Sequence, residues 1–420
     1  MVHQARLVAV VVMSSPGESS VTENHAAPVM SRRTLLGRII QGLGLSFALG
    51  PAIPFVQAKE RAAETDATDH LIVRVARPLD AETPVQEFSS YLTPNARFFV
   101  RSHFGPPPQE QLSDENWQLN VTGLVDRPLT LTLHDLKQFE AITITAVVQC
   151  SGNGRASYRP KTPGVQWDRG AVGNARWTGV RLRDVLLKAG LQPNGHHVQF
   201  QGADRPVAAM VPLFVRSIPV EKALHPDTIL AYEMNGRPLP LLHGAPLRVV
   251  TPGWMADSCI KWLTDITVQQ DEAQGYYMQT AYRHPTRPVE PGEAIAASDL
   301  KPVEAMVVKS LIAQPSEGTS LAPGPVTIQG VAWTGEGRIV TVEVSLDGGL
   351  TWEPARLIGE DQPYSWRQWQ YIWQATGPGL HTILCRATDD CGQTQPKASP
   401  WNPSGFLWNG WDYVSVTVAG

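Results

Sequence analysis

One cysteine stands at a position where chemistry could take place. The apolar run 143–149 ends at Cys150, and the glycine-rich stretch 151–155 follows it directly. A thiol at a strand end, beside a loop with almost no side chains, can be approached closely by a bulky ligand. The local sequence leaves a second interpretation open, because a free cysteine is often a small buried hydrophobe. The chain has no Cys-x-x-Cys-His haem motif and no cysteines and histidines at zinc-ligand spacing.

Three arginines in separate segments could bind a small anion near this loop. Arg101 lies in the run 98–103, Arg155 follows the glycines, and Arg367 lies in the run 365–369. Guanidinium groups bind oxyanions through paired, charge-assisted hydrogen bonds. Taken singly, each arginine could equally be a solvated surface residue, so their convergence is a hypothesis.

Residue patterns predict the elements that would position these side chains. Residues 117–121, 198–201 and 247–250 alternate as strands do. Residues 182–189 have helical spacing, and Gly190 follows them as a helix-ending glycine. With 420 residues the chain exceeds what one hydrophobic core normally supports, so at least two domains are expected.

The chain changes character near residue 301. From 301 to 420, short strands follow one another between turns, among them 326–331, 340–345, 383–387 and 413–418. This spacing predicts an immunoglobulin-like β-sandwich after a mixed α+β domain at 84–300, an α+β fold as a whole. Cys385 and Cys391 could pair in a disulfide, but the alternation places Cys385 more simply in the core of the sandwich.

The N-terminal region is typical of an export signal. Arg32-Arg33, followed by two leucines, precedes a moderately apolar run that ends in small residues at Ala58. This pattern predicts a cleaved twin-arginine (Tat) signal at 1–58, with Met30 as an alternative start, and a linker at 59–83. The prolines and glycines of the apolar run disfavour a stable membrane span. The expected location is therefore periplasmic, and the Tat route suits a protein that is loaded with a cofactor before export.

Several long motifs, in order along the chain, resemble the sulfite oxidase family of molybdenum enzymes. They are Arg-Ser-His at 101–103 after the double phenylalanine, Cys-Ser-Gly-Asn-Gly-Arg at 150–155, Ala-Tyr-Glu-Met-Asn-Gly-Arg-Pro-Leu-Pro at 231–240, Lys-Trp-Leu at 261–263 and Val-Ser-Leu-Asp-Gly-Gly-Leu-Thr-Trp at 344–352. The resemblance covers almost the whole chain from residue 84 onward. It implies a molybdopterin-binding domain followed by a dimerisation domain. One departure is Gly154, where many relatives carry an arginine.

The resemblance implies a role for each matching residue. Cys150 would be the thiolate ligand of molybdenum, a soft donor suited to a redox-active metal. The positions that match the family's substrate pocket are Arg101, Arg155, Trp167, Tyr282 and Arg367. The positions that match its pterin and phosphate site are Phe99, Val100, Arg101, Ser102, His103, Asp204, His243, Arg248, Cys259, Ile260 and Lys261.

The resemblance also implies an activity, namely oxidation of sulfite to sulfate by oxo transfer at a molybdenum-molybdopterin cofactor. No haem is expected in this chain, so electrons would pass singly to an external c-type cytochrome, and the protein would be a homodimer. Two alternatives remain: the same cofactor could serve nitrate or sulfoxide reduction, or the chain could be a non-enzymatic exported binding protein. The formal net charge of −4 disfavours a nucleic-acid partner.

Overall fold

The computed structural model describes residues 70–420 except 114 and 336. Backbone contacts divide the chain into two compact units, residues 1–58 and 59–420, and every described residue belongs to the second. The predicted signal region 1–58, with Met30, lies outside the described residues. In the part of the chain that the structure describes, no helix has the length and apolar character needed to cross a membrane.

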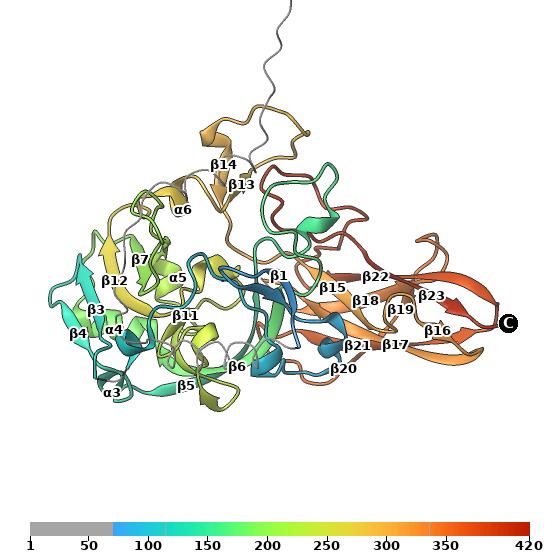
Figure 1. Ribbon diagram of the computed structural model, residues 1–420, viewed down its shortest axis with the longest axis horizontal. Helices are drawn as coiled ribbons and strands as arrows, with labels where there is room; N and C mark the ends of the chain where they lie inside the picture. Colours follow the sequence, from blue (N-terminus) through green and yellow to red (C-terminus); the bar gives the residue numbers. More distant parts are fainter. Residues whose placement is uncertain (1–69, 114, 336) are drawn as a thin grey trace, which may run out of the picture. The chain divides into compact units, whose positions relative to one another are not determined.

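The first domain of the second unit is built on two five-stranded sheets (Figure 1). Its strands are β3 (Leu119–Gly123), β4 (Leu129–Leu131), β5 (Ala141–Gln149), β6 (Val172–Arg181), β7 (His197–Gly202), β8 (Val215–Pro219), β9 (Ile229–Met234), β10 (Arg237–Pro238), β11 (Arg248–Val250) and β12 (Leu263–Gln269). One sheet has the order β10-β9-β6-β5, with β11 paired to β9, and the other the order β4-β3-β12-β7-β8. The helices α3 (Leu133–Leu136), α4 (Leu182–Ala189), α5 (Val220–Ala223) and α6 (Tyr276–Gln279) are short. The predicted mixed α+β domain is confirmed.

Local sequence explains these elements. Along β7 the side chains of Val198 and Phe200 are fully buried and their neighbours are not, as the alternating pattern predicts. Helix α4 buries one apolar face and ends at Gly190, whose φ of 78° suits a residue without a Cβ. Strand β5 pairs with β6 in an unbroken antiparallel register from Ala141 to Gln149, so the end of β5 is held rigidly.

The end of the predicted linker is folded. Strands β1 (Ile72–Val75) and β2 (Asp80–Glu82) form an antiparallel hairpin, and all three residues of β2 are buried. Ala81 exchanges backbone hydrogen bonds with Val100, at 2.9 and 2.8 Å. The prediction of a polar linker overlooked the β-branched residues Ile72, Val73 and Val75 of β1, which favour a strand.

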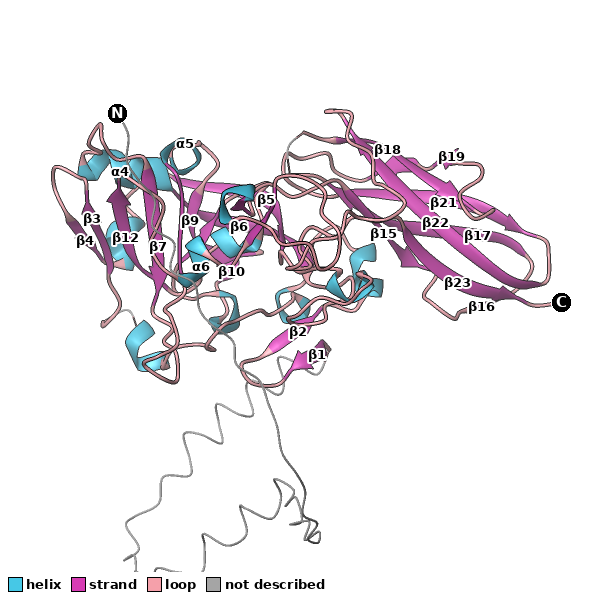
Figure 2. Cartoon of the chain, turned by 90° about the horizontal axis from the view of Figure 1, so that it is seen from above, coloured by secondary structure: helices cyan, strands magenta, loops and turns pink. Residues whose placement is uncertain are grey.

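The second domain is a sandwich of two sheets (Figure 2). Its strands are β15 (Lys309–Gln314), β16 (Ser320–Leu321), β17 (Gly324–Trp333), β18 (Ile339–Ser345), β19 (Glu353–Pro354), β20 (Arg356–Ile358), β21 (Arg367–Ala375), β22 (Gly379–Asp389) and β23 (Asp412–Val418). One sheet has the order β15-β17-β21-β20 and the other β16-β23-β22-β18-β19. Apolar residues of both sheets form one core, and Cys385 is fully buried in it. Cys385 and Cys391 form no disulfide, which confirms the core alternative.

Tight contacts join the two domains near the end of β5. A shared core brings Val147 of β5 together with Trp333 and Trp366 of the sandwich. The Trp333 indole nitrogen donates a 2.7 Å hydrogen bond to the Gln149 side chain. The second domain therefore supports the strand that carries Cys150. The junction also contains β13 (Arg283–Pro285), β14 (Leu300–Pro302) and the short 3-10 helices η1 (Val85–Ser89), η2 (Asn95–Arg97), η3 (Gln109–Leu112), η4 (Arg155–Ser157), η5 (Leu241–His243), η6 (Ala256–Ser258) and η7 (Ala297–Asp299).

A close approach in the sandwich makes one glycine difficult to replace. A Cβ built on Gly330 of β17 would lie 1.9 Å from the Leu311 carbonyl oxygen of the paired strand β15. Since that oxygen belongs to the backbone of the sheet, Gly330→Ala should destabilise the protein by about 1–3 kcal/mol or more. The measurement is the urea midpoint followed by tryptophan fluorescence.

Gly377 provides the matched control for this substitution. A Cβ at this position would make only ordinary contacts, at 3.8 and 4.0 Å from the His381 ring. Gly377→Ala is expected to leave the urea midpoint nearly unchanged. Equal midpoints for the two variants would contradict the packing argument.

Candidate active site

Most of the predicted site residues line one cavity in the first domain. Those that line it are Phe99, Arg101, Ser102, His103, Cys150, Asp204, His243, Arg248, Cys259, Ile260, Lys261 and Tyr282. They come from segments that are far apart in the sequence and that the two sheets bring together. Val100, Arg155, Trp167 and Arg367 do not line it.

Cys150 lies at the wall of this cavity directly after β5. Its backbone nitrogen donates to the Ala171 oxygen at 2.9 Å, and its side chain is only 7% exposed. Burial raises the pKa of the Cys150 thiol, and the positive charges of Arg101 and Arg155 oppose that rise. The two arginines thus favour the thiolate, which is the form that binds metals.

Gly154 shapes the loop after Cys150. Its φ is +91°, and a Cβ at this position would lie 2.5 Å from the Trp408 indole of the second domain. A larger residue would therefore need both another backbone conformation and another position for Trp408. This contact gives a physical reason for the departure from the family pattern at Gly154.

Two cations line the cavity and form no ion pair with a described carboxylate, namely the buried Arg248 and the half-buried Lys261. Lys261 donates from Nζ to Ser102 Oγ at 3.0 Å and to the Leu242 oxygen at 2.9 Å. Arg248 is 4% exposed and donates to the His243 oxygen at 3.0 Å and to the Cys259 oxygen at 3.3 Å. Among the described residues, neither cation forms an ion pair with a carboxylate. An anion bound here would compensate both charges.

The pKa values of the neighbouring groups follow from burial. Burial, with the charge of Arg248, lowers the pKa of Lys261 to about 7. Burial lowers the pKa of His243 to about 3, although its hydrogen bond to the Asn95 carbonyl opposes the shift. Burial also raises the pKa of Asp204 to about 6, against the charge of Lys261. The site therefore holds a neutral histidine beside cations that are costly to keep charged.

Arg101, His103 and Tyr282 form the other side of the cavity. Arg101 Nη1 forms an ion pair with Asp80 of β2 at 3.1 Å. Burial alone would lower the pKa of Arg101, but Tyr282 and Asp80 outweigh it and raise that pKa. The Tyr282 hydroxyl lies 2.9 Å from His103 Nε2, and burial lowers the pKa of His103 well below its usual value.

Tyr282 is held in a strained conformation. Its φ is +53°, in the left-handed region that favours glycine. Its ring stacks on Phe406 of the second domain, with centroids 5.4 Å apart and an angle of 4° between the rings. Such strain persists only where the surroundings over-determine the conformation, and it is concentrated at functional sites.

The four remaining predicted residues lie in other surroundings. Arg155 is 7% exposed and donates to the Val165 oxygen at 2.9 Å and to the Ser404 oxygen at 3.1 Å, and its charge reaches Cys150 from outside the cavity. Val100 pairs with β2, and Trp167 is buried in the same core cluster as Cys150. Arg367 forms an ion pair with Asp361 at 3.4 Å. The second domain therefore contributes Ser404 and Phe406 to this region, and the structure does not bring Arg367 to the cavity.

Sequence reasoning missed several residues that surround the cavity. Ser151, Asp257 and Phe214 line it, while Arg216 and Tyr277 contact residues that do. The Phe214 ring stacks on His103, with centroids 4.1 Å apart. A usable signal existed, because Arg216 is a single charge inside the otherwise uncharged strand β8. Such a charge needs a buried partner.

Comparisons with known proteins agree with this geometry. Two family models match the chain: the oxidoreductase molybdopterin binding domain at residues 104–277 and the Mo-co oxidoreductase dimerisation domain at residues 301–419. Mitochondrial sulfite oxidase of Macaca fascicularis is 37% identical over 386 residues, which are 87% of this chain and 69% of that protein. Sulfite oxidase of Arabidopsis thaliana is 34% identical over 86% of this chain and 97% of its own length. The crystal structure of the sulfane dehydrogenase SoxCD of Paracoccus pantotrophus has a TM-score of 0.70 at 27% identity, over 88% of this chain and 92% of that one.

The fold, the cavity and these matches define a molybdenum oxidoreductase with a molybdopterin-binding domain and a dimerisation domain. The chain belongs to the sulfite oxidase family. The predicted family, fold class and enzyme class are confirmed.

The cavity fits the anionic molybdopterin cofactor that this family implies. The unpaired cations Lys261 and Arg248 suit a phosphate, and the buried Cys150 suits a soft metal. The described residues contain no cluster of three or more histidine, cysteine or acidic side chains that could hold a metal ion.

Lys261→Met should have opposite effects on cofactor binding and on stability. Loss of a charge-assisted hydrogen bond, worth about 1.5–3 kcal/mol, should weaken cofactor retention by roughly ten- to a hundredfold. The cofactor-free protein should become as stable or more stable, since a half-buried cation that forms no ion pair, and whose desolvation outweighs the attraction of Asp204, is removed. The measurements are molybdenum per chain after gel filtration and the urea midpoint of cofactor-free protein.

The pKa of Lys261 gives the sign of the pH dependence. The usual lysine value is 10.5 and the folded value is about 7, so between these values the unfolded chain holds the extra proton. Cofactor-free wild type should therefore gain stability relative to Lys261→Met as the pH rises from about 7 to 10. The exposed Lys301 provides the control, and Lys301→Met should change neither the cofactor retention nor the pH dependence of stability. A parallel loss of retention and stability in Lys261→Met would contradict this account.

Proposed function

We propose that this protein oxidises sulfite to sulfate at a molybdenum-molybdopterin cofactor. The observation that carries the proposal is the placement of Arg101, which lines the cavity with Cys150, and of Arg155, which lies outside the cavity, since the charges of both act on the Cys150 thiol. Two guanidinium groups around one thiolate suit a small oxyanion that reacts beside the metal. The similarity to sulfite oxidases from an animal and a plant supports the same substrate.

Each residue has a stated part in this reaction. Arg101 would bind the sulfite oxygens and orient the sulfur lone pair, while Arg155 adds positive charge from behind Cys150. Tyr282 would donate a hydrogen bond, because burial raises the pKa of its hydroxyl to about 12 and keeps the proton on it near neutral pH. Cys150 would hold the metal, and Arg248 and Lys261 the phosphate. The bound cofactor supplies oxygen-atom transfer, so that sulfite and water become sulfate, two protons and two electrons.

The electrons would leave singly to a separate c-type cytochrome. The match to a dimerisation domain supports a homodimer.

The twin arginine Arg32-Arg33 supports export by the Tat route and a periplasmic location. We expect a variant with Arg32→Lys and Arg33→Lys to remain in the cytoplasm, measured by cell fractionation and immunoblotting, with a periplasmic marker exported by the Sec route as control. Undiminished export of that variant would contradict the Tat assignment.

Purified exported protein provides the test of the function. The expected result is molybdenum in stoichiometric amount and sulfite-dependent reduction of cytochrome c and of ferricyanide. Nitrate and methionine sulfoxide should give no turnover with a reduced viologen dye, and thiosulfate none with cytochrome c. Purified protein without molybdenum would contradict the proposed molybdenum-molybdopterin cofactor. Molybdenum-loaded protein that is inert to sulfite but reduces nitrate or a sulfoxide would contradict the substrate.

A further inference from the structure

A buried ion pair lies beside the cavity and has no part in the reaction described above. Arg216 of β8 and Asp257 of η6 are 1% and 6% exposed, and Arg216 Nη2 lies 2.6 Å from Asp257 Oδ2. Replacing such a pair by apolar residues is often neutral or stabilising, because removing two charges from water costs about as much as their attraction returns. Stability alone therefore explains the presence of this ion pair poorly.

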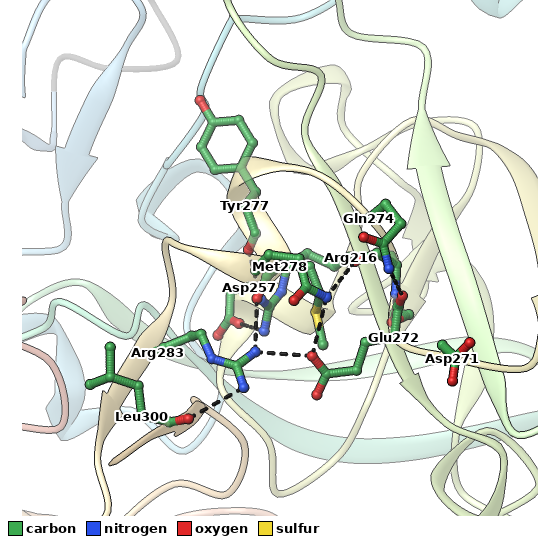
Figure 3. Close-up of polar contacts among 12 residues, drawn as sticks. Arg216, Asp257, Asp271, Glu272, Gln274, Tyr277, Met278, Arg283 and Leu300 are labelled. Carbon is green, nitrogen blue, oxygen red and sulfur yellow. Dashed lines mark hydrogen bonds and ion pairs between the residues drawn. The ribbon is translucent and has the colours of Figure 1, made fainter. Parts of the chain in front are cut away.

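This ion pair is connected to two segments that surround the cavity, the loop after Cys150 and the segment 277–282. Asp257 Oδ1 accepts a 2.7 Å hydrogen bond from Ser151 Oγ, next to Cys150. Arg216 Nη1 donates a 2.7 Å hydrogen bond to the Tyr277 backbone oxygen, and its guanidinium carbon lies 5.5 Å from the centre of the Tyr282 ring. Figure 3 shows the Arg216 guanidinium between Asp257 and the Tyr277 backbone.

A second arginine supports the same turn from its other end. Arg283 donates to Glu272 at 2.9 Å, to the Met278 oxygen at 3.1 Å and to the Leu300 oxygen at 3.3 Å (Figure 3). These bonds fix the chain after Tyr282, and Arg216 fixes the chain before it. The Arg216 side of this support connects to the Cys150 loop entirely through buried side chains, by way of Asp257 and Ser151.

We infer that Arg216 and Asp257 are positioning residues, which hold the strained Tyr282 and the Cys150–Ser151 loop in fixed relation to each other. The inference rests on the proposed function, because that proposal gives Cys150 and Tyr282 their roles in the reaction. Tyr282 needs such support because its left-handed backbone is unfavourable on its own. Small displacements of reacting groups are costly, and about 1 Å can lower a rate by roughly a hundredfold.

The test separates positioning from stability by using one double variant. Arg216→Met and Asp257→Leu singly each leave a buried charge unpaired, so both should lower the urea midpoint. The double variant carries an apolar pair of similar volume and should recover the midpoint. Its kcat with sulfite should nevertheless stay about ten- to a hundredfold below wild type, with a much smaller change in KM. Arg386→Met with Glu343→Leu, which removes an ion pair in the sandwich, is the control and should leave kcat unchanged.

A second readout needs no cofactor. In cofactor-free protein, loss of the Ser151–Asp257 hydrogen bond should let the Cys150 loop open more often. Alkylation of Cys150 by iodoacetamide, followed by peptide mass spectrometry, should become about ten- to a hundredfold faster in the double variant. Cys391 is exposed in the sandwich and serves as the internal control, with an unchanged rate.

The outcomes decide between positioning and a purely structural role. Wild-type kcat in the double variant, or an unchanged alkylation rate of Cys150, would overturn the inference. A wild-type protein that does not oxidise sulfite would refute the proposed function instead. In that case the alkylation rates still decide whether the ion pair restrains the Cys150 loop.

Discussion

Cys150→Ser is expected to abolish sulfite oxidation, with a loss in kcat beyond the roughly ten- to a hundredfold that residues outside the ligand shell cause. The substitution keeps the size of the side chain but replaces a soft thiolate by a hydroxyl, which binds a soft, redox-active metal poorly. The charges of Arg101 and Arg155 stabilise a cysteine thiolate at position 150. A serine hydroxyl stays protonated there, so it gains nothing from these charges. The measurements are sulfite-dependent ferricyanide reduction and molybdenum per chain.

Cys391→Ser is the matched control, because Cys391 is exposed in the second domain. This variant should keep wild-type kcat and metal content. The fold should survive in both variants, which the urea midpoint will verify. A Cys150→Ser protein that oxidises sulfite at the wild-type rate would show that the thiol is only a core residue, the alternative that the local sequence left open.

Arg101→Met is expected to act mainly on substrate binding. A lost charge-assisted hydrogen bond costs about 1.5–3 kcal/mol, so KM for sulfite should rise by roughly ten- to a hundredfold. The fall in kcat should be smaller, because Cys150 and Tyr282 keep their other contacts. Steady-state kinetics over a wide range of sulfite concentration will separate the two constants.

The ion pair between Arg101 and Asp80 complicates that experiment, since the variant leaves a buried carboxylate without its partner. Arg74→Met provides the control, because Arg74 pairs with Glu82 on the same hairpin but does not line the cavity. Arg74→Met should lose as much stability as Arg101→Met, but its KM for sulfite should stay at the wild-type value. A rise in KM of equal size in both variants would assign the effect of Arg101 to the hairpin.

Local patterns were sufficient to predict most elements of the fold. The alternation along β7, the glycine after α4 and the strands of the sandwich all depend on residues close in sequence. In the hairpin of β1 and β2, the β-branched residues of β1 favour a strand, but the residues of β2 do not show their burial in the sequence. Asp80 and Glu82 are polar, and they are buried only because Arg101 and Arg74 lie across from them.

The site residues that sequence could not predict are likewise those whose partners lie far along the chain. The motif around Cys150 and the cations Arg248 and Lys261 could be found from ordered motifs, and all three line the cavity. The ion pair of Arg216 and Asp257 joins residues 41 positions apart, and no local pattern couples them. Likewise, sequence could not indicate that the segment at Ser404, rather than that at Arg367, turns toward Arg155.

The contact between the end of the second domain and the Cys150 loop has a consequence for the order of biosynthesis. Leu407 donates a backbone hydrogen bond to the Ser151 oxygen at 3.0 Å, Phe406 stacks on Tyr282, and Ser404 anchors Arg155. These residues follow the whole first domain in the sequence. The binding site is therefore incomplete until they have been synthesised, and a nascent chain that stops before residue 404 should not capture molybdopterin stably.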